Sequence, residues 1–335
     1  MIHISYPRGL VADTVKREYG KIVPEAVTLE ELNIKGASRF SLHAVTSPRF
    51  ICTLRVSTDY NQQLEIKTFV KNRGNVLQEF ENMRLLWQAH YSRREKYQIP
   101  EPLHVDEKHG LLFLKYWPGE SFLSSFYRWA DRGQQSRRST AAEYAECAAQ
   151  WLVDFQDIYS SEEEKGVPPE LLNFDAQVAT ATPFTPAIRQ RIIDKMRGLQ
   201  ESLPRLRDTC VHDQYLFRNI LYKCGKTCVV DFPHFRMGWP LYDFLTFYTG
   251  IERLKQYPLF SAATAELMKN VFAQTYFAGK GGCYDAEELE NLWAFFIVAY
   301  ISGRYRNKNL GKIRKIVNNI FIRNMLSKVV TWSQK

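Results

Sequence analysis

The chain of 335 residues is 45% hydrophobic and 24% charged, a composition that excludes a disordered chain and is sufficient for two lobes with buried cores. Six cysteines scattered along the sequence favour reduced thiols in a cytoplasmic protein over a disulfide framework. The net charge of +9 arises after Glu290, where nine Lys and Arg residues follow without any Asp or Glu, and this asymmetry favours an anionic partner such as a phosphorylated substrate, a membrane surface or nucleic acid.

The N-terminal part of the chain is predicted to be rich in β-structure. Residues 1–35 have mixed character, with a short helix predicted around Asp13–Tyr19. Branched and aromatic residues then alternate with turn-like sequences and predict three strands, at 39–47, 50–59 and 63–71. Because side chains alternate along a strand, Lys67 and Lys71 are expected on one face of the third strand.

A helix, a strand and a turn are predicted next. Leu77, Phe80 and Trp87 recur at helical spacing and predict a helix over Val76–His90. An apolar strand over Gly110–Lys115 then leads into the sequence YWPG, in which the Pro and Gly predict a turn. The place of this turn, between a β-rich and a helical part of the chain, favours a hinge between two lobes.

Helical patterns dominate after residue 120. Apolar residues at helical spacing predict helices at 140–159, 188–203, 241–254, 260–277, 285–303 and 311–331. The charged stretch SSEEEKGVPP, at 160–169, is predicted to be a surface loop. A β-rich part followed by a helical part predicts an α+β fold with a small β-rich lobe and a large helical lobe.

Residues 210–243 carry the strongest indication of chemistry. Two apolar runs flank a turn at Gly225 and predict a β-hairpin, at Ile220–Tyr222 and Cys228–Val230. Asn219 precedes the first run and Asp231 follows the second, so a hairpin brings both to one end of two paired strands. Their oxygens are hard ligands that suit Mg²⁺, which completes its shell with water and phosphate. The plainer interpretation is a capping Asn and a turn Asp.

The order of these residues resembles the phosphate-transfer core of the aminoglycoside phosphotransferase-like and protein kinase-like families. Their pattern is H-x-D-x-x-x-x-N, then a hydrophobic hairpin, then an Asp. Here His212 and Asn219 stand seven positions apart, and Asp231 follows twelve positions later. The stretch GWPLYDF, at 238–244, resembles the segment after the metal Asp in small-molecule kinases, and GLLFLKYWPGESF, at 110–122, resembles their hinge.

The resemblance implies a bilobal protein kinase-like fold and covers roughly residues 35–250. The implied parts are a β-rich nucleotide-binding lobe at 1–114, a hinge at 115–120 and a helical lobe at 121–335. The helical lobe is expected to contain the catalytic loop, the metal-binding hairpin and a basic C-terminal helix.

The resemblance also implies how the nucleotide phosphates are held. In these families a lysine on the third strand contacts the phosphates and pairs with a glutamate of the next helix. Lys67 and Glu79 are the best matches, with Lys71 and Glu81 as alternates. The resemblance therefore makes Lys67 and Glu79 nucleotide-binding residues.

The hinge and the metal ligands follow from the same resemblance. The hinge acid of the family is replaced by Lys115, which leaves nucleotide contacts to backbone groups near Tyr116 and Trp117. Asn219 and Asp231 are implied as the ligands of Mg²⁺, and the Asp of GWPLYDF as a structural residue of the next helix.

The catalytic base departs from the family pattern. Gln214 stands five positions before Asn219, where the pattern has Asp, and Asp213 lies one position earlier. Gln cannot accept a proton from a hydroxyl at neutral pH. A one-residue adjustment of the loop would let Asp213 act as the base, with His212 bracing the catalytic loop, because phosphoryl transfer depends mainly on positioning and charge neutralisation.

These features predict a phosphotransferase that uses Mg²⁺ and ATP to modify a hydroxyl of a small molecule, a sugar or a lipid-linked sugar. Two alternatives stay open. A pseudokinase would bind nucleotide without transfer, because Gln214 replaces the base. A kinase-fold nucleotidyltransferase would transfer from the α-phosphate instead.

The basic C-terminal helix leaves two interpretations open. It packs on the helical lobe with a solvated basic face, or it docks on an anionic membrane, which would suit a glycolipid acceptor. No apolar run reaches the roughly 18 residues of a membrane span, so we expect a cytoplasmic protein, peripheral to the inner face of the membrane if the helix docks. Nucleic acid is disfavoured as a partner because no recognised binding motif accompanies the basic residues.

Overall fold

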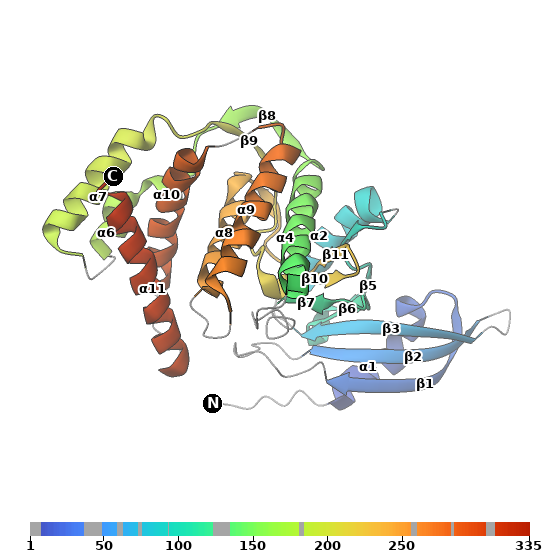
Figure 1. Ribbon diagram of the computed structural model, residues 1–335. Helices are drawn as coiled ribbons and strands as arrows, with labels where there is room; N and C mark the ends of the chain where they lie inside the picture. The colour runs from blue at the N-terminus through green and yellow to red at the C-terminus, as the bar shows by residue number, and fades with distance from the viewer. Residues whose placement is uncertain are drawn as a thin grey trace. The chain divides into compact units, whose positions relative to one another are not determined.

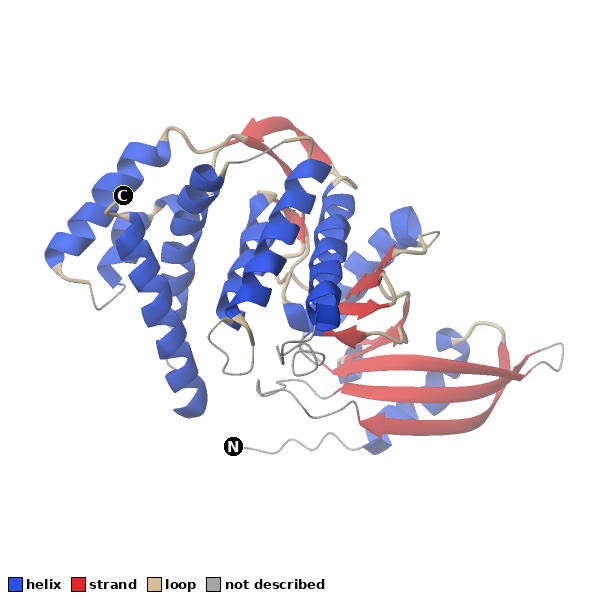
Figure 2. Ribbon diagram, in the orientation of Figure 1, coloured by secondary structure: helices blue, strands red, loops and turns tan. Residues whose placement is uncertain are grey.

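The structure, a computed structural model, describes residues 8–36, 49–58, 63–72, 76–92, 94–122, 135–180, 184–255, 260–282, 285–305 and 312–335 (Figure 1). It divides into two compact units, of which the first contains Met1–Ser125 and Phe217–Phe235 and the second Phe126–Leu216 and Arg236–Lys335. Helices and strands are both abundant (Figure 2), which confirms the predicted α+β class. None of the described helices combines the length and apolar character needed to cross a membrane.

The first unit contains a five-stranded sheet in the order β1-β2-β3-β6-β5, in which all neighbouring strands are antiparallel. The strands are β1 (Ala26–Gly36), β2 (Arg49–Thr58), β3 (Gln63–Asn72), β5 (Pro102–Asp106) and β6 (Leu111–Lys115). Helix α1 (Arg8–Ile22) packs against this sheet (Figure 1). Val11 and Val15, four residues apart on α1, are buried in one core with Leu54 and Phe113.

The N-terminal region contains more regular structure than the sequence predicts. The predicted short helix is part of the longer α1, and β1 is not predicted at all. Register shifts at Ala26/Thr28 and Leu29/Glu31 interrupt the pairing of β1 with β2. Such irregularities break the period-two alternation by which a strand is recognised. Strands β2 and β3 confirm two of the three predicted strands, whereas 39–47 lies outside the described residues.

A second sheet in the same unit contains the predicted hairpin. Its order is β4-β11-β10-β7, with β4 at Tyr97–Gln98, β7 at Glu120–Ser121, β10 at Ile220–Lys223 and β11 at Lys226–Val229. The turn residues Cys224 and Gly225 have φ of 47° and 74°, as a tight two-residue hairpin turn requires. Helix α2 (Val76–Leu86) continues into a short π-helical turn at Trp87–Tyr91.

The second unit is mainly helical. Its helices are α4 (Gln135–Gln156), α5 (Pro169–Leu172), α6 (Phe174–Thr180), α7 (Pro186–Gln200), α8 (Leu241–Leu254), α9 (Ala262–Gly279), α10 (Ala286–Tyr305) and α11 (Lys312–Trp332). Aromatic side chains fill its core. The ring of Trp151 in α4 stacks on that of Tyr215 with 5.5 Å between ring centroids, and the Tyr215 ring packs against Phe247 of α8 with 5.4 Å between centroids. All six helices predicted after residue 120 are present.

The prediction of a surface loop at 160–169 is wrong for its first part. Residues Ser160–Lys165 form β8, which pairs with β9 (Leu206–Val211) in a three-stranded sheet of order β12-β9-β8, where β12 is Arg236–Gly238. The charged side chains of β8 remain largely exposed, and Lys165 pairs with Asp208 at 2.6 Å. Backbone pairing with β9 determines this edge strand, and composition does not reveal it.

Three lysines surround the carboxylate of Glu252 in α8. Lys255, Lys269 of α9 and Lys328 of α11 contact it at 2.7, 2.8 and 2.5 Å, although its side chain is only 2% exposed. Burial alone would raise the pKa of Glu252, but the three ammonium groups outweigh burial and lower that pKa to about 2. The cluster therefore connects the C-terminal helix to the rest of the second unit.

Replacing Glu252 by Gln is expected to lower the free energy of unfolding by about 3–5 kcal/mol at pH 7, because three ammonium groups lose their shared counter-charge. The stabilisation by Glu252 is present above pH 4.5 and is lost as the pH falls toward 2, because its pKa is lower in the folded than in the unfolded chain. Urea unfolding measures the difference. Glu266→Gln is the control, because Glu266 contacts Lys255 and Lys269 but is 51% exposed, so a loss below about 1 kcal/mol is expected. Equal losses in the two variants would contradict this account.

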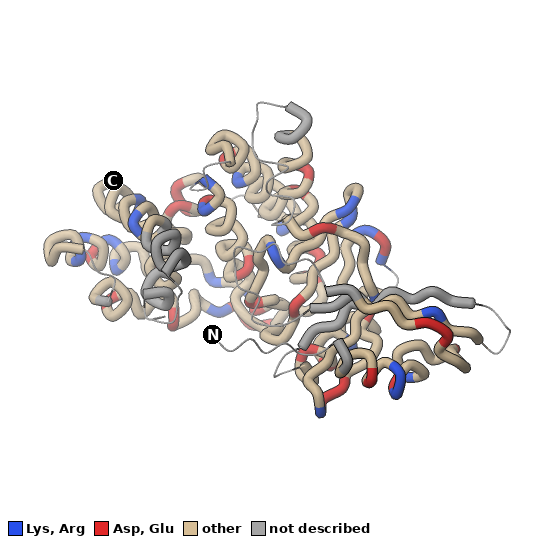
Figure 3. The backbone as a smooth tube through the Cα atoms, turned by 90° about the horizontal axis from the view of Figure 1, so that it is seen from below, with Lys and Arg blue, Asp and Glu red and all other residues tan. Residues whose placement is uncertain are grey.

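Part of the basic C-terminal tail is neutralised within the protein. Lys328 pairs with Glu252, and Lys335 contacts both carboxylate oxygens of Glu290 at 2.7 Å. Ile322, Met325, Leu326, Val329 and Trp332 form the buried side of α11. Elsewhere in the described chain, acidic and basic residues are interspersed (Figure 3). The packed, solvated interpretation accounts for the described part of α11, and membrane docking stays a prediction.

Candidate active site

The β10–β11 hairpin holds the two predicted metal ligands at one end. Ile220 pairs with Val229, and the N–H of Val230 donates to the Asn219 carbonyl at 2.9 Å. Asn219 and Asp231 therefore both lie at the end away from the turn, and both residues are fully buried. Asp231 has φ of 87°, a left-handed conformation that ends the alternation of the strand at this residue.

Helix α2 fixes the backbone directly after Asp231. The N–H of Phe232 donates to Oε1 of Glu79 at 3.3 Å, and the carbonyl of Phe232 accepts from Nδ2 of Asn82 at 2.9 Å. Glu79 and Asn82 are both buried, and Gln78 orients Asn82 by donating to its Oδ1 at 2.9 Å. These contacts hold the uncommon backbone conformation of Asp231 from its C-terminal side.

The donor set at this end of the hairpin fits Mg²⁺. Asn219 and Asp231 offer an amide and a carboxylate, and Mg²⁺ binds through one or two carboxylates together with substrate phosphates and water. Among the described residues, no group of three or more His, Cys, Asp or Glu side chains is placed to hold a metal ion.

The predicted phosphate-binding residues are placed in part. Lys67 and Lys71 lie in β3, but their side chains fall outside the described part of the structure. Glu79 is buried in α2, whereas Glu81 is 40% exposed and pairs with Arg84 at 2.7 Å. Burial thus distinguishes Glu79 from Glu81, and the Lys67–Glu79 pair stays a prediction.

The predicted hinge connects β6 to β7. Lys115 pairs with Glu101 at 2.9 Å and is 64% exposed, so its ammonium group faces solvent. The indole N–H of Trp117 donates to Oε1 of Gln98 at 2.7 Å. The roles of the Tyr116 and Trp117 backbones in nucleotide binding stay predictions.

The predicted catalytic loop is held by Asp243, at the start of α8. The N–H groups of His212 and Asp213 donate to its two carboxylate oxygens at 2.6 and 3.0 Å. The N–H of Gln214 donates to Nδ1 of His212 at 3.2 Å, and the Tyr215 hydroxyl donates to a backbone carbonyl of α4 at 2.7 Å. Four successive residues of the loop are thus fixed by hydrogen bonds.

Asp243 is itself a titratable group in an unusual environment. It is fully buried, and burial raises its pKa to about 7, although the N–H groups of His212 and Asp213 oppose that rise. The structural role that the family resemblance implies for this residue corresponds to its two hydrogen bonds to the loop backbone.

Asp213 presents a carboxylate at the surface of this loop. Its φ is 66°, its side chain is 28% exposed, and Nη2 of Arg236 donates to its Oδ1 at 3.1 Å. The Arg236 guanidinium also lies over the ring of Tyr242 at 5.6 Å. Burial raises the pKa of Tyr242 to about 12, and the Asp213 charge adds to that rise. The carboxylate is therefore oriented from one side and remains open to solvent.

The structure brings the predicted residues together in two groups. His212 and Asp213 lie on one loop of the second unit, and Asn219 and Asp231 lie at one end of a hairpin of the first unit. Asn82 and Arg236 are not predicted from the sequence, because each contacts its group through a distant segment of the chain. The assignment of catalytic, nucleotide-binding and metal-binding roles stays a prediction.

Comparison with known proteins identifies the family. A model of the phosphotransferase enzyme family matches residues 53–289, well over half of the chain. The chain belongs to this family. This match confirms the resemblance to aminoglycoside phosphotransferase-like proteins. The reaction class of the family is phosphoryl transfer. No curated protein matches the sequence at a significant level.

Several solved structures share the fold of this chain. A choline/ethanolamine kinase family protein from Mesorhizobium loti is 15% identical with a TM-score of 0.52, covering 96% of this chain and 98% of that chain. A glucosamine kinase in complex with glucosamine, ADP and inorganic phosphate is 11% identical with a TM-score of 0.53, covering 92% and 96%. A macrolide 2′-phosphotransferase from Brachybacterium faecium is 13% identical with a TM-score of 0.52, covering 93% and 97%. These similarities confirm the predicted protein kinase-like fold.

Proposed function

We propose that the protein is an ATP- and Mg²⁺-dependent kinase that phosphorylates a hydroxyl of a small molecule, with sugars and lipid-linked sugars as the acceptor class. The observation that carries the proposal is the buried Asn219–Asp231 pair at one end of the hairpin, because this donor set suits an ion shared with phosphates. Membership of the phosphotransferase enzyme family supports the reaction class.

Asn219 and Asp231 are the residues that would hold Mg²⁺ in this proposal. The bound ion would neutralise negative charge on the phosphates of ATP. The contacts of Glu79 and Asn82 with Phe232 would keep the Asp231 backbone in place.

Asp213 is the proposed general base. Its carboxylate would accept the proton of the acceptor hydroxyl while that oxygen bonds to the γ-phosphorus and the bond to the β–γ bridging oxygen breaks, releasing ADP. Arg236 orients the carboxylate, and Asp243 fixes its backbone. The side chain of Gln214 has no role as a base in this mechanism.

Replacing Asp213 by Asn is expected to lower kcat for phosphoryl transfer by about 10²–10⁴-fold, the usual contribution of a general base. Transfer of label from [γ-³²P]ATP to acceptor measures this, with glucosamine, which one fold relative binds, among the first acceptors tested. Gln214→Ala is the control and is expected to retain most of the wild-type rate.

The same assay separates the alternatives. If the wild-type protein binds nucleotide but neither labels an acceptor nor hydrolyses ATP, the kinase proposal is overturned and a pseudokinase is favoured. Label transferred from [α-³²P]ATP and not from [γ-³²P]ATP would favour nucleotidyl transfer. Loss of activity in Gln214→Ala with retention in Asp213→Asn would show that Asp213 is not the general base and that the Gln214 amide contributes to transfer by positioning.

A further inference from the structure

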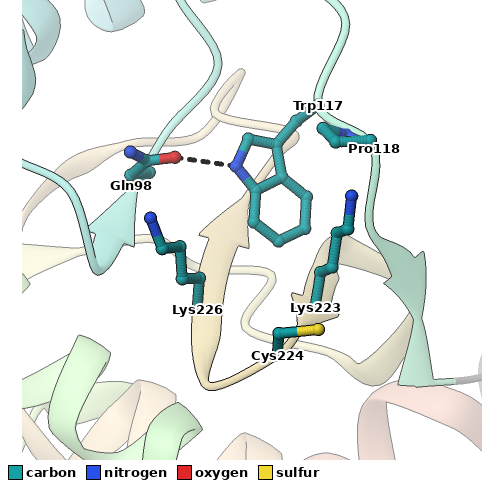
Figure 4. A pocket seen from close by; sticks show the side chains of 6 residues that line it. All are labelled: Gln98, Trp117, Pro118, Lys223, Cys224 and Lys226. Atoms are coloured by element: carbon teal, nitrogen blue, oxygen red, sulfur yellow. Dashed lines mark hydrogen bonds between the residues drawn. The ribbon is translucent and has the colours of Figure 1, made fainter.

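A pocket in the first unit lies at the turn of the β10–β11 hairpin, beside the hinge. Its volume is about 320 Å³, near the lower limit for small-molecule sites. It is lined by Gln98, Trp117, Pro118, Lys223, Cys224 and Lys226 (Figure 4). Neither the metal-binding nor the catalytic proposal uses the side chains of these residues.

The indole of Trp117 is held in place within this pocket. Its N–H donates to Oε1 of Gln98 at 2.7 Å, and Nε2 of Gln98 in turn donates to the carbonyl of Arg94 at 2.9 Å. The ring also lies against the backbone of Gly119, where a Cβ atom would meet Cζ3 of the indole at 1.6 Å. A fixed aromatic face can stack on a ligand with little loss of conformational entropy.

Two ammonium groups accompany this aromatic face. Lys223 and Lys226 are cross-strand partners at the last pair before the turn, and Figure 4 shows their side chains on either side of the Trp117 indole. Both are exposed, and within the described chain neither forms an ion pair. Like charges directly opposite each other destabilise a hairpin, so the pair is not explained by the stability of the hairpin. An anion bound between the two would relieve their repulsion.

The geometry points to a binding site for a small planar aromatic anion. The aromatic ring of the ligand stacks on the Trp117 indole, and its carboxylate lies between the ammonium groups of Lys223 and Lys226. The site is distinct from the proposed metal site, because the two lie at opposite ends of the hairpin. The four residues of β10 separate the turn from Asn219 by about 13 Å, at roughly 3.3 Å per residue.

Naphthalene-2-carboxylate is a suitable probe, with naphthalene-2-carboxamide as its neutral counterpart. Isothermal titration of the full chain is expected to show one site for the carboxylate and binding about tenfold weaker or worse for the amide. The double variant Lys223→Gln/Lys226→Gln is expected to bind the carboxylate about tenfold more weakly than the wild type and to bind the amide with unchanged affinity. The double variant Lys16→Gln/Lys108→Gln changes two exposed lysines elsewhere in this unit and is expected to bind like the wild type.

Two substitutions test the aromatic face without changing charge. Trp117→Leu removes the indole, and Gly119→Ala forces it from its position because of the close approach at this glycine. Both are expected to weaken binding of the carboxylate and the amide alike by about fivefold or more. Circular dichroism of each variant verifies that the fold is retained.

Cys224 supplies a reporter at the site itself. It is exposed, whereas Cys52, Cys147, Cys210 and Cys228 are buried. Its alkylation, followed by mass spectrometry of the peptide that contains it, is expected to slow as naphthalene-2-carboxylate is added. The rate of Cys224 alkylation by anionic iodoacetate is divided by the rate with neutral iodoacetamide. This ratio is expected to be higher in the wild type than in the Lys223→Gln/Lys226→Gln variant.

Three results would overturn the inference. One is equal affinity for the carboxylate and the amide, and another is unchanged carboxylate binding in Lys223→Gln/Lys226→Gln. The third is competitive displacement of the probe by ATP, which would make the pocket part of the nucleotide site. Binding that persists in the presence of saturating ATP supports a separate site, whether or not the protein proves to be a kinase.

Discussion

Replacing Asp231 by Asn is expected to lower kcat for phosphoryl transfer by about 10³-fold or more, because loss of the carboxylate proposed to bind Mg²⁺ would remove several kcal/mol of charge stabilisation. The fold is expected to survive. Asn has the same shape as Asp and is among the few residues that tolerate a positive φ, which is 87° at this position. The rate is measured as a function of Mg²⁺ concentration at saturating ATP.

A binding measurement tests Asp231 independently of turnover. A non-hydrolysable ATP analogue with Mg²⁺ is expected to raise Tm of the wild type and to have a much smaller effect on Asp231→Asn, since a ligand stabilises only the state that binds it. Asp157→Asn is the matched control, because Asp157 is 61% exposed and far from the hairpin in sequence. Full Mg²⁺-dependent stabilisation of Asp231→Asn would show that this carboxylate is not a metal ligand.

The sequence predicts those parts of the site that local spacing determines. Asn219 and Asp231 flank two apolar runs joined by a two-residue turn, and hairpin geometry alone places them at one end. The same hairpin brings Lys223 and Lys226 together. The pocket that they line also needs Trp117, which comes from a distant segment, so hairpin geometry alone does not predict it.

The contacts that fix the site come from segments distant in the sequence. Arg236 reaches Asp213 because β12 pairs with β9, and Asn82 reaches Phe232 across 150 positions of the chain. Local periodicity contains no information about such contacts. For the same reason β8 is not predicted, because pairing with β9 outweighs its polar composition.

Replacing Asp243 by Asn is expected to remove a pH dependence from the stability of the protein. In the wild type, burial raises the pKa of Asp243 from 3.8 to about 7, so the folded state binds this proton more tightly than the unfolded state. The corresponding stabilisation is complete below pH 3.8 and is lost as the pH rises through about 7. The loss is on the order of 4 kcal/mol, because each pH unit between the two pKa values contributes about 1.4 kcal/mol.

The Asn variant has no proton to lose but makes weaker contacts. Its side-chain amide presents one oxygen and one NH₂ group to the N–H groups of His212 and Asp213, so one hydrogen bond is lost, at about 1–3 kcal/mol. Near pH 4 the variant is therefore expected to be less stable than the wild type, and above pH 7 the difference is expected to vanish or reverse. Urea unfolding between pH 4 and 9 measures the difference. Asp157→Asn is the control, because it shows the effect of removing an exposed carboxylate on the free energy of unfolding. A difference that does not vary with pH would mean that the two backbone N–H groups outweigh burial and that Asp243 is ionised throughout this range.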